Sequence, residues 1–185
     1  MRAFFCIELE DEIKERLDGI TQSLKRRDGA RVSWVKRENL HITLKFLGEV
    51  VPERVEELRL AAEVAHEGIG PFELELNLLG AFPSLERPRV IWVGSSSPPP
   101  EILRLYERLE RELEPLGFPP EGKPYTPHVT LGRVKEKDRV KVGRLRERLE
   151  GIEPFQIVAE ARGLTLMESR LDPRGAIYTP IFRLG

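Results

Sequence analysis

The sequence of 185 residues contains one cysteine, Cys6, and no long run of apolar residues. A single cysteine cannot form a disulfide within the chain, and without a Cys-x-x-Cys pair the commonest zinc-site pattern is missing. We expect Cys6 to pack as a small hydrophobic residue. No stretch approaches the ~20 consecutive apolar residues that a membrane-spanning helix needs, so the sequence predicts no membrane segment.

The sequence also lacks an excess of either charge. Its formal net charge is -1, from 30 Lys and Arg against 31 Asp and Glu. Such a balance does not favour non-specific binding of nucleic acid over the whole surface, although a polyanion can bind at a local site. The apolar start, residues 1–7, is too short for a signal peptide and is followed by acidic residues. We therefore expect a cytoplasmic protein of one compact domain without membrane association.

Hydrophobic periodicity predicts alternating strands and helices. In the first half we expect strands at 3–9, 32–35, 40–47 and 72–76, and helices at 11–24 and 53–66. The second half is expected to contain strands at 89–93, 128–131 and 155–159, and helices at 101–116 and 140–149. Two closing strands are predicted at 163–167 and 176–184, with a turn between them at 172–175.

The two halves correspond residue by residue as well as element by element. The tetrad His41-Ile42-Thr43-Leu44 lies over His128-Val129-Thr130-Leu131 at an offset of 87 positions (128 − 41 = 87). Residues 2–6 lie over residues 89–93 at the same offset. This pattern predicts two like lobes related by an approximate twofold axis. We expect a single bilobal domain over 1–185, with repeats at about 2–80 and 89–163 and closing strands at 163–185.

Two His-Thr pairs occupy corresponding strands of this repeat. Because side chains alternate across a strand, His41 and Thr43 should share one face while their neighbours face the core. His128 and Thr130 should do the same in the second half. One histidine in a strand is more often a packed or surface residue than a catalyst, but two at matching positions favour catalysis. His66, at the end of a predicted helix, has no counterpart and is interpreted as a surface or helix C-terminal histidine.

Two histidines across a groove can hydrolyse a phosphodiester without a metal or another cofactor. With an ordinary pKa near ~6.5, one imidazole can take a proton from water while the other, protonated, donates to the leaving oxygen. The hydroxyls of Thr43 and Thr130 could donate hydrogen bonds to the non-bridging phosphate oxygens. The residues alone leave open which histidine is the acid and which is the base.

With these tetrads the chain resembles the two-histidine (2H) phosphoesterase superfamily, whose signature is two His-x-Thr-x motifs about one lobe apart. The resemblance covers nearly the whole chain and includes residues 2–7, 34–40 and 127–133. Among the branches, the chain is most similar to the bacterial and archaeal RNA 2',3'-cyclic phosphodiesterases, formerly described as 2'-5' RNA ligases. The resemblance implies an α+β fold. It would be a bilobal pseudo-twofold duplication, with two antiparallel sheets, helices on the outer faces and an active-site groove between the lobes.

The resemblance also implies a reaction and roles for individual residues. An RNA 2',3'-cyclic 3'-phosphodiesterase opens a terminal 2',3'-cyclic phosphate and leaves the phosphate on O2', and attack by an RNA 5'-hydroxyl in place of water would give weak 2'-5' ligation. His41 would be the proton donor to O3' and His128 the proton acceptor that activates water. Arg133 matches the family's phosphate-binding arginine, together with Thr43 and Thr130 at the site. Strand parity turns Arg133 away from His128 unless Gly132 introduces a bulge.

The expected partner is RNA with a 2',3'-cyclic phosphate end, tRNA fragments included, bound by a monomer that needs no metal. Bases are bound by aromatic faces, for which Phe46, Phe82, Trp92 and Tyr125 are candidates. Lys45 is a second candidate for the phosphate, although we expect its side chain to be exposed.

Two other functions remain open. One is a phosphodiesterase for small molecules such as ADP-ribose 1'',2''-cyclic phosphate or a cyclic nucleotide. The other is an RNA-binding module without catalysis, although both tetrads are intact.

Overall fold

The computed structural model describes residues 1–185, and its elements follow the predicted order of strands and helices. The α-helices are α1 (Asp11–Leu24), α2 (Val55–His66), α3 (Pro100–Leu113) and α4 (Gly143–Glu150). The strands are β1 (Arg2–Glu8), β2 (Val32–Trp34), β3 (His41–Glu49), β4 (Phe72–Leu76), β5 (Leu78–Pro83), β6 (Pro88–Gly94), β7 (His128–Val134), β8 (Ile157–Ala161), β9 (Leu164–Asp172) and β10 (Gly175–Leu184).

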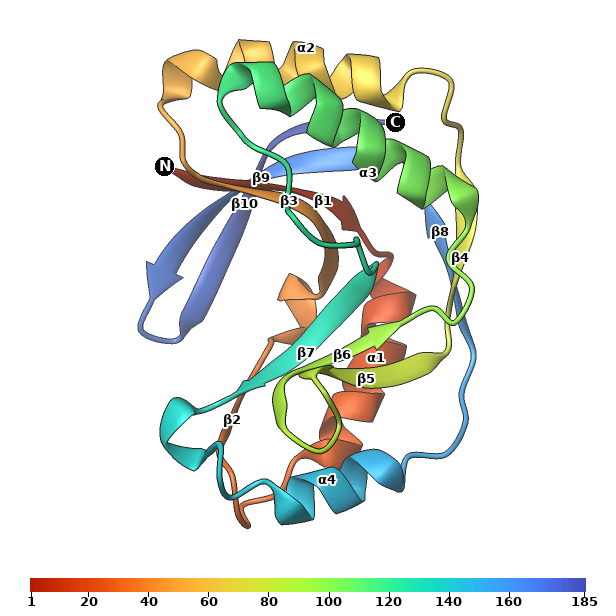
Figure 1. Ribbon diagram of the computed structural model, residues 1–185, viewed down its shortest axis with the longest axis vertical. Helices are drawn as coiled ribbons and strands as arrows, with labels where there is room; N and C mark the ends of the chain where they lie inside the picture. The colour runs from red at the N-terminus through yellow and green to blue at the C-terminus, as the bar shows by residue number, and fades with distance from the viewer.

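Eight strands form one antiparallel sheet that divides into two halves (Figure 1). The first half-sheet has the order β10-β9-β1-β3, and the second has the order β7-β6-β5, with β2 added to β7. The halves meet at one register pair, Ile42 on β3 and Val129 on β7. Strands β4 and β8 form a separate two-stranded antiparallel sheet along one side of the molecule. The predicted α+β fold with antiparallel sheets is thus confirmed.

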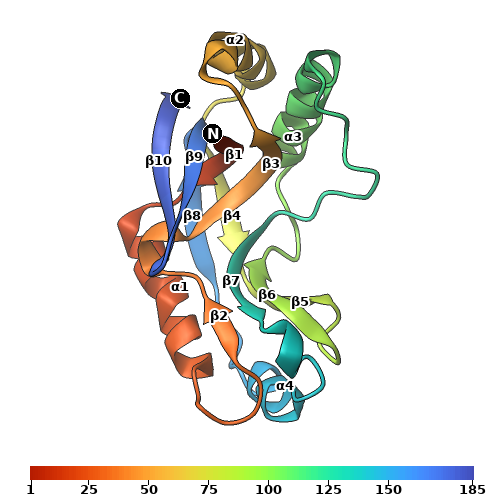
Figure 2. The ribbon, with the colours of Figure 1, turned by 90° about the vertical axis from the view of Figure 1, so that its left-hand side faces the viewer.

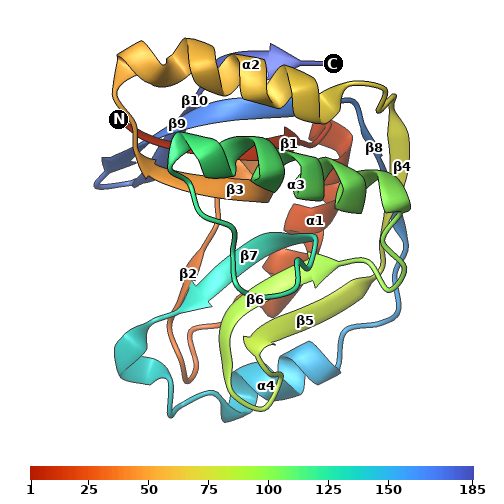
Figure 3. The ribbon, with the colours of Figure 1, turned by 45° about the horizontal axis from the view of Figure 1, so that its top comes forward.

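The helices are exchanged between the two repeats. The first half-sheet is covered by α2 and by α3, which comes from the second repeat, and these two helices pack against each other (Figure 3). The second half-sheet is covered by α4 and by α1 from the first repeat (Figure 2). We call each half-sheet with its two helices a lobe, the first with α2 and α3 and the second with α1 and α4. Neither sequence repeat is therefore a lobe by itself.

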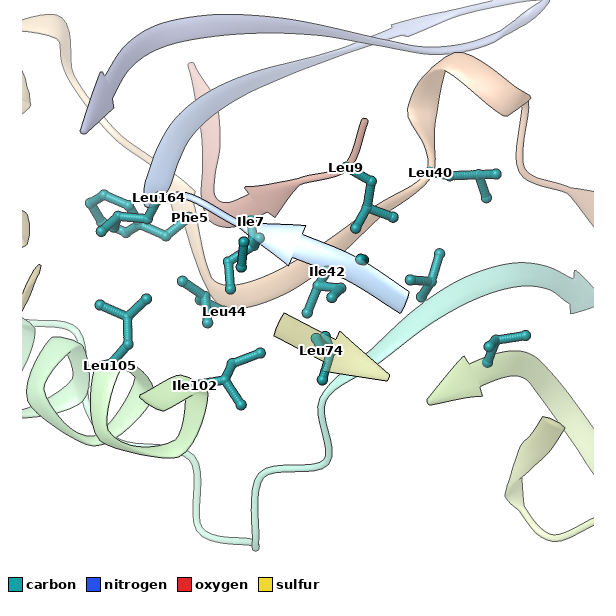
Figure 4. Packing of buried hydrophobic residues seen from close by; sticks show 14 of the residues in the cluster. Phe5, Ile7, Leu9, Leu40, Ile42, Leu44, Leu74, Ile102, Leu105 and Leu164 are labelled. Atoms are coloured by element: carbon teal, nitrogen blue, oxygen red, sulfur yellow. The ribbon is translucent and has the colours of Figure 1, made fainter. Parts of the chain in front are cut away.

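One hydrophobic core runs through both lobes. It contains 38 buried residues, contributed by both half-sheets and all four helices. Figure 4 shows its centre, where Ile7 and Ile42 of the first half-sheet face Ile102 on α3 and Leu74 on β4. Because burial of apolar surface is the main favourable term in folding, a core shared in this way makes the lobes interdependent.

The offset of 87 predicted for the first strand of each repeat is wrong by one residue. Cys6 lies opposite Thr43 in the β1–β3 ladder, and Trp92 lies opposite Thr130 in the β6–β7 ladder. Strands β1 and β6 therefore correspond at an offset of 86 (92 − 6 = 86), while β3 and β7 keep the offset of 87. The sequence match failed because both strands are almost wholly apolar, so a shift of one residue leaves the hydrophobic pattern unchanged.

Strand β5 was not predicted from the sequence. Gly80 and Pro83 lie within it, and both residue types indicate a loop when they are seen without their neighbours. In the structure Gly80 lies opposite Trp92 of β6, and the indole ring occupies the space above the glycine.

None of the helices is both long enough and apolar enough to cross a membrane.

The close approach of Trp92 to Gly80 gives a testable prediction for stability. A Cβ atom on Gly80 would lie 2.4 Å from two atoms of the buried indole ring, so Gly80→Ala must displace it. We expect a loss of about 1–3 kcal/mol in the free energy of unfolding, measured by urea denaturation. The control is Gly19→Ala, within α1, where a Cβ meets nothing within 4 Å. The control should gain up to about 1 kcal/mol, and a stable Gly80→Ala protein would contradict the prediction.

Candidate active site

His41 and His128 are the first residues of β3 and β7, directly beside the junction of the two half-sheets. In both tetrads the histidine and the threonine are partly exposed, while the second and fourth residues are buried. His41, Thr43, His128 and Thr130 all line one cavity of about 390 Å³. The predicted strand alternation is confirmed, and the structure brings the two His-Thr pairs together.

Each imidazole is held in the same way by the chain that precedes it. Nδ1 of His41 lies 2.7 Å from the carbonyl oxygen of Asn39, and Nδ1 of His128 lies 2.6 Å from that of Thr126. A carbonyl oxygen only accepts, so Nδ1 must carry the proton and donate. This leaves Nε2 as the atom that can accept or deliver a proton at the cavity. Nε2 of His41 also lies 2.9 Å from the hydroxyl oxygen of Thr43.

Aromatic rings surround both histidines. Phe4 and Tyr178 lie beside His41, with ring centroids 5.0 and 5.4 Å away. Phe82 and Trp92 lie beside His128, at 5.1 and 5.9 Å. Burial among these groups lowers the pKa of both imidazoles below the ordinary value because the charged form loses water. The hydrogen bonds from Nδ1 oppose this effect and favour the charged form.

Each histidine strand contains a β-bulge at the same point of the repeat. In β3 the bulged residue is Leu44, which lies between the partners of Phe5 and Cys6, and in β7 it is Leu131. A bulge adds one residue to one strand and reverses the alternation beyond it. Arg133 consequently lies on the same face as His128 and lines the cavity. The bulge that strand parity required for Arg133 is present, and its extra residue is Leu131, directly before Gly132.

The two bulges also show where the duplicated halves differ. The position that corresponds to Arg133 in the first half is Phe46, whose side chain is exposed and also lines the cavity. One side of the cavity therefore presents a guanidinium and the other an aromatic ring. Charge repulsion adds to burial in lowering the pKa of both histidines: Arg133 and Lys123 act on His128, while Lys14 and His128 act on His41.

Lys45 is buried, so the expectation of an exposed side chain was wrong. The bulge at Leu44 turns it toward α3, and only 3% of its side chain is exposed. Its Nζ lies 2.7 Å from a carboxylate oxygen of Glu110 and donates to the carbonyl of Pro119 at 2.6 Å. A lysine paired in this way is a structural cation and not a free phosphate ligand.

Among the four aromatic candidates, Phe46, Phe82 and Tyr125 line the cavity, and Trp92 is buried beneath Phe82. Sequence reasoning missed Tyr178 and Lys123, which also line it. Tyr178 belongs to β10, outside the sequence repeat, and Lys123 lies in an irregular segment without periodicity. The signal available for Tyr178 was an aromatic residue within the predicted closing strand 176–184.

The remaining candidates lie away from this cavity or are fully packed. His66 is the last residue of α2, as expected for a helix C-terminal histidine. Cys6 is fully buried as a free thiol beside Phe4 and Met167, which confirms that it packs as a hydrophobic residue. No group of three or more His, Cys, Asp or Glu side chains is arranged to hold a metal ion.

Known proteins resemble this chain along its whole length. A model of the family described as LigT like Phosphoesterase matches twice, over residues 7–92 and 93–178. The RNA 2',3'-cyclic phosphodiesterase of Methanocaldococcus jannaschii is 35% identical over 182 residues, which is 98% of either chain. The RNA 2',3'-cyclic phosphodiesterase of Methanothermobacter thermautotrophicus is 35% identical over 188 residues, and the match covers 100% of this chain and 99% of the other.

Solved structures agree with these sequence matches. The crystal structure of E. coli LigT complexed with 3'-AMP has a TM-score of 0.79 and 30% sequence identity. The match covers 99% of this chain and 96% of that one. With two family matches, full-length relatives and a common fold, the chain belongs to the LigT-like phosphoesterase family, within the two-histidine superfamily that its tetrads indicated.

Proposed function

We propose that this protein is an RNA 2',3'-cyclic 3'-phosphodiesterase that opens a terminal cyclic phosphate and leaves the phosphate on O2'. The observation that carries the proposal is the pair of imidazoles at one cavity, each with Nδ1 bonded to a carbonyl and Nε2 left for proton transfer. Relatives named RNA 2',3'-cyclic phosphodiesterase support the choice of substrate.

In the proposed reaction, Nε2 of neutral His128 takes a proton from a water molecule as that water attacks the phosphorus. The bond between phosphorus and O3' breaks, and protonated His41 donates its Nε2 proton to O3'. The product carries a 2'-phosphate and a 3'-hydroxyl. Thr43, Thr130 and Arg133 donate hydrogen bonds to the phosphate oxygens, where negative charge develops. With an RNA 5'-hydroxyl in place of water as the nucleophile, the same displacement of O3' joins two RNA ends through a 2'-5' bond.

The assignment of base and acid follows the family resemblance and is supported by the Thr43 hydroxyl at His41. Arg133 and Lys123 disfavour the imidazolium form of His128. Lys14 and His128 act on His41 in the same way, so these charges favour the neutral form of both histidines and do not by themselves assign the base. His41 has the Thr43 hydroxyl at its Nε2, and this hydroxyl can accept the Nε2 proton while the imidazole is charged.

The cavity also suits a terminal nucleotide of a longer chain. Its volume of about 390 Å³ lies within the range of ligand pockets, and the aromatic rings at its wall can stack on a base. Because one chain supplies both histidines, we propose that it acts as a monomer. We place this activity in the cytoplasm, on RNA fragments with cyclic phosphate ends, tRNA fragments among them.

Removing either histidine tests the acid–base mechanism. His41→Ala and His128→Ala should each lower kcat by at least 10²–10⁴-fold, the usual contribution of one general acid or base. His66→Ala serves as the control and should leave kcat unchanged. Since the two imidazoles move both protons, EDTA should have no effect on hydrolysis of a cyclic phosphate. Strong inhibition by EDTA would refute the metal-free mechanism.

Arg133 offers a test of the roles through the pH dependence of kcat/KM. The free enzyme should give a bell-shaped profile whose two limbs both lie at lower pH than for unperturbed histidines, because burial lowers the pKa of both imidazoles. Arg133→Gln removes a cation near His128, so the pKa of His128 should rise. If His128 is the base, the acidic limb moves to higher pH and KM increases. Movement of the alkaline limb alone would reverse the assignment.

Substrate length and product analysis separate RNA from small molecules as substrate. An oligonucleotide with a 2',3'-cyclic phosphate end should be hydrolysed with a higher kcat/KM than the cyclic mononucleotide. Phosphorus NMR of the product should show a 2'-phosphate, since O3' is the leaving group. A preference for the mononucleotide or for ADP-ribose 1'',2''-cyclic phosphate would favour the small-molecule alternative.

A further inference from the structure

An irregular segment, residues 117–127, links α3 of the first lobe to β7 of the second, and we call it the strap (Figure 2). We propose that Tyr125 in the strap is a positioning residue that fixes the two histidine tetrads relative to each other. This inference rests on the proposed function, because it concerns the geometry between the acid and the base.

Tyr125 and its neighbour contact both tetrads. The Tyr125 hydroxyl donates to the carbonyl oxygen of Thr43 at 2.9 Å, within the first tetrad. The carbonyl oxygen of the next residue, Thr126, accepts the Nδ1 proton of His128 at 2.6 Å, in the second tetrad. Two consecutive residues therefore connect the backbone of one His-Thr pair to the imidazole of the other.

This connection lies where the two half-sheets share little else. The ladder between β3 and β7 consists of one register pair, Ile42 and Val129. This single pair joins the two strands at one point of the sheet, while the packed core joins the lobes as a whole. The hydrogen bond from Tyr125 to Thr43 adds a second attachment at this junction, because it holds the chain three residues before His128 against β3.

The side chain of Tyr125 packs against the first lobe. Its ring stacks on Tyr106 of α3, with centroids 4.0 Å apart and planes 7° from parallel. Burial raises the pKa of its hydroxyl, so the group remains a hydrogen-bond donor at all physiological pH values.

The beginning of the strap is attached to the same lobe by the buried Lys45–Glu110 pair. Lys45 donates to the carbonyl of Pro119, and the backbone N–H of Glu121 donates to Glu110 at 2.9 Å. The strap is thus tied to the first lobe along its length before it enters β7. The position of His128 is consequently set by the lobe that carries His41.

The expected consequence is a defect in turnover and not in substrate affinity. In-line displacement needs the acid and the base on opposite sides of the phosphorus, and an error of ~1 Å in such placement can lower the rate ~10²-fold. Tyr125→Phe keeps the stacked ring and removes only the donor to Thr43. We expect kcat to fall at least tenfold while KM for a cyclic-phosphate oligonucleotide stays within twofold.

The matched control is Ser23→Ala, which likewise removes a hydroxyl that donates to a backbone carbonyl, that of Ile20 at 2.7 Å, but in α1 and away from the cavity. Its kcat should stay within twofold of the wild type, and urea unfolding should show both variants folded. If Tyr125→Phe retains wild-type kcat, the inference is wrong. It is equally wrong if the two variants lose activity in parallel with stability, because that result indicates a purely structural role.

A spectroscopic measurement tests the link without substrate. Two-dimensional ¹H–¹⁵N NMR of the imidazoles should show shifted signals for both His41 and His128 in Tyr125→Phe. The signals of His66 should be unchanged there, and all three histidines should be unchanged in Ser23→Ala. An unmoved His128 signal would overturn the inference. If the wild type fails to open cyclic phosphates, the proposed function fails, and the NMR result still decides whether Tyr125 couples the two tetrads.

Discussion

Ile42 on β3 and Val129 on β7 face each other at the junction of the two half-sheets, and both side chains are fully buried. Because side chains alternate along a strand, burying these two turns His41, Thr43, His128 and Thr130 to the opposite face. Hydrophobic packing at the junction thereby orients four polar side chains that need not pack at all. A polar substitution at either position would disturb the core and the cavity together.

Duplication explains most of the site's symmetry, and local sequence explains where the symmetry ends. Both histidine strands have the same alternation, the same bulge and the same carbonyl contact to Nδ1. Two identical imidazoles would compete equally for one proton, whereas acid–base catalysis needs them in different states. The bulges place Phe46 and Arg133 at equivalent points, so one half contributes an aromatic ring to the cavity where the other contributes a guanidinium.

The role of the tetrads, the order of most strands and helices and the fold class could be predicted from the sequence, because apolar periodicity and short motifs are local properties. The side of the strand on which Lys45 and Arg133 lie could not be predicted, because it depends on bulges. These bulges are visible only in the pairing of β3 and β7 with their neighbouring strands. Strand β5 was missed because Gly80 accommodates Trp92, a contact between strands. Tyr178 reaches His41 from a strand outside the repeat.

The exchange of helices between the repeats bears on how such a site stays assembled. If each repeat had folded as its own lobe, the two histidines would belong to separate units held together by a small interface. Here α3 covers the first half-sheet and continues through the strap into β7, while α1 leaves β1 to cover the second half-sheet. The chain therefore crosses between the lobes at the strap and again between β1 and α1. Moving the lobes apart would uncover the shared core, so the separation of the histidines is maintained by the same burial that stabilises the fold.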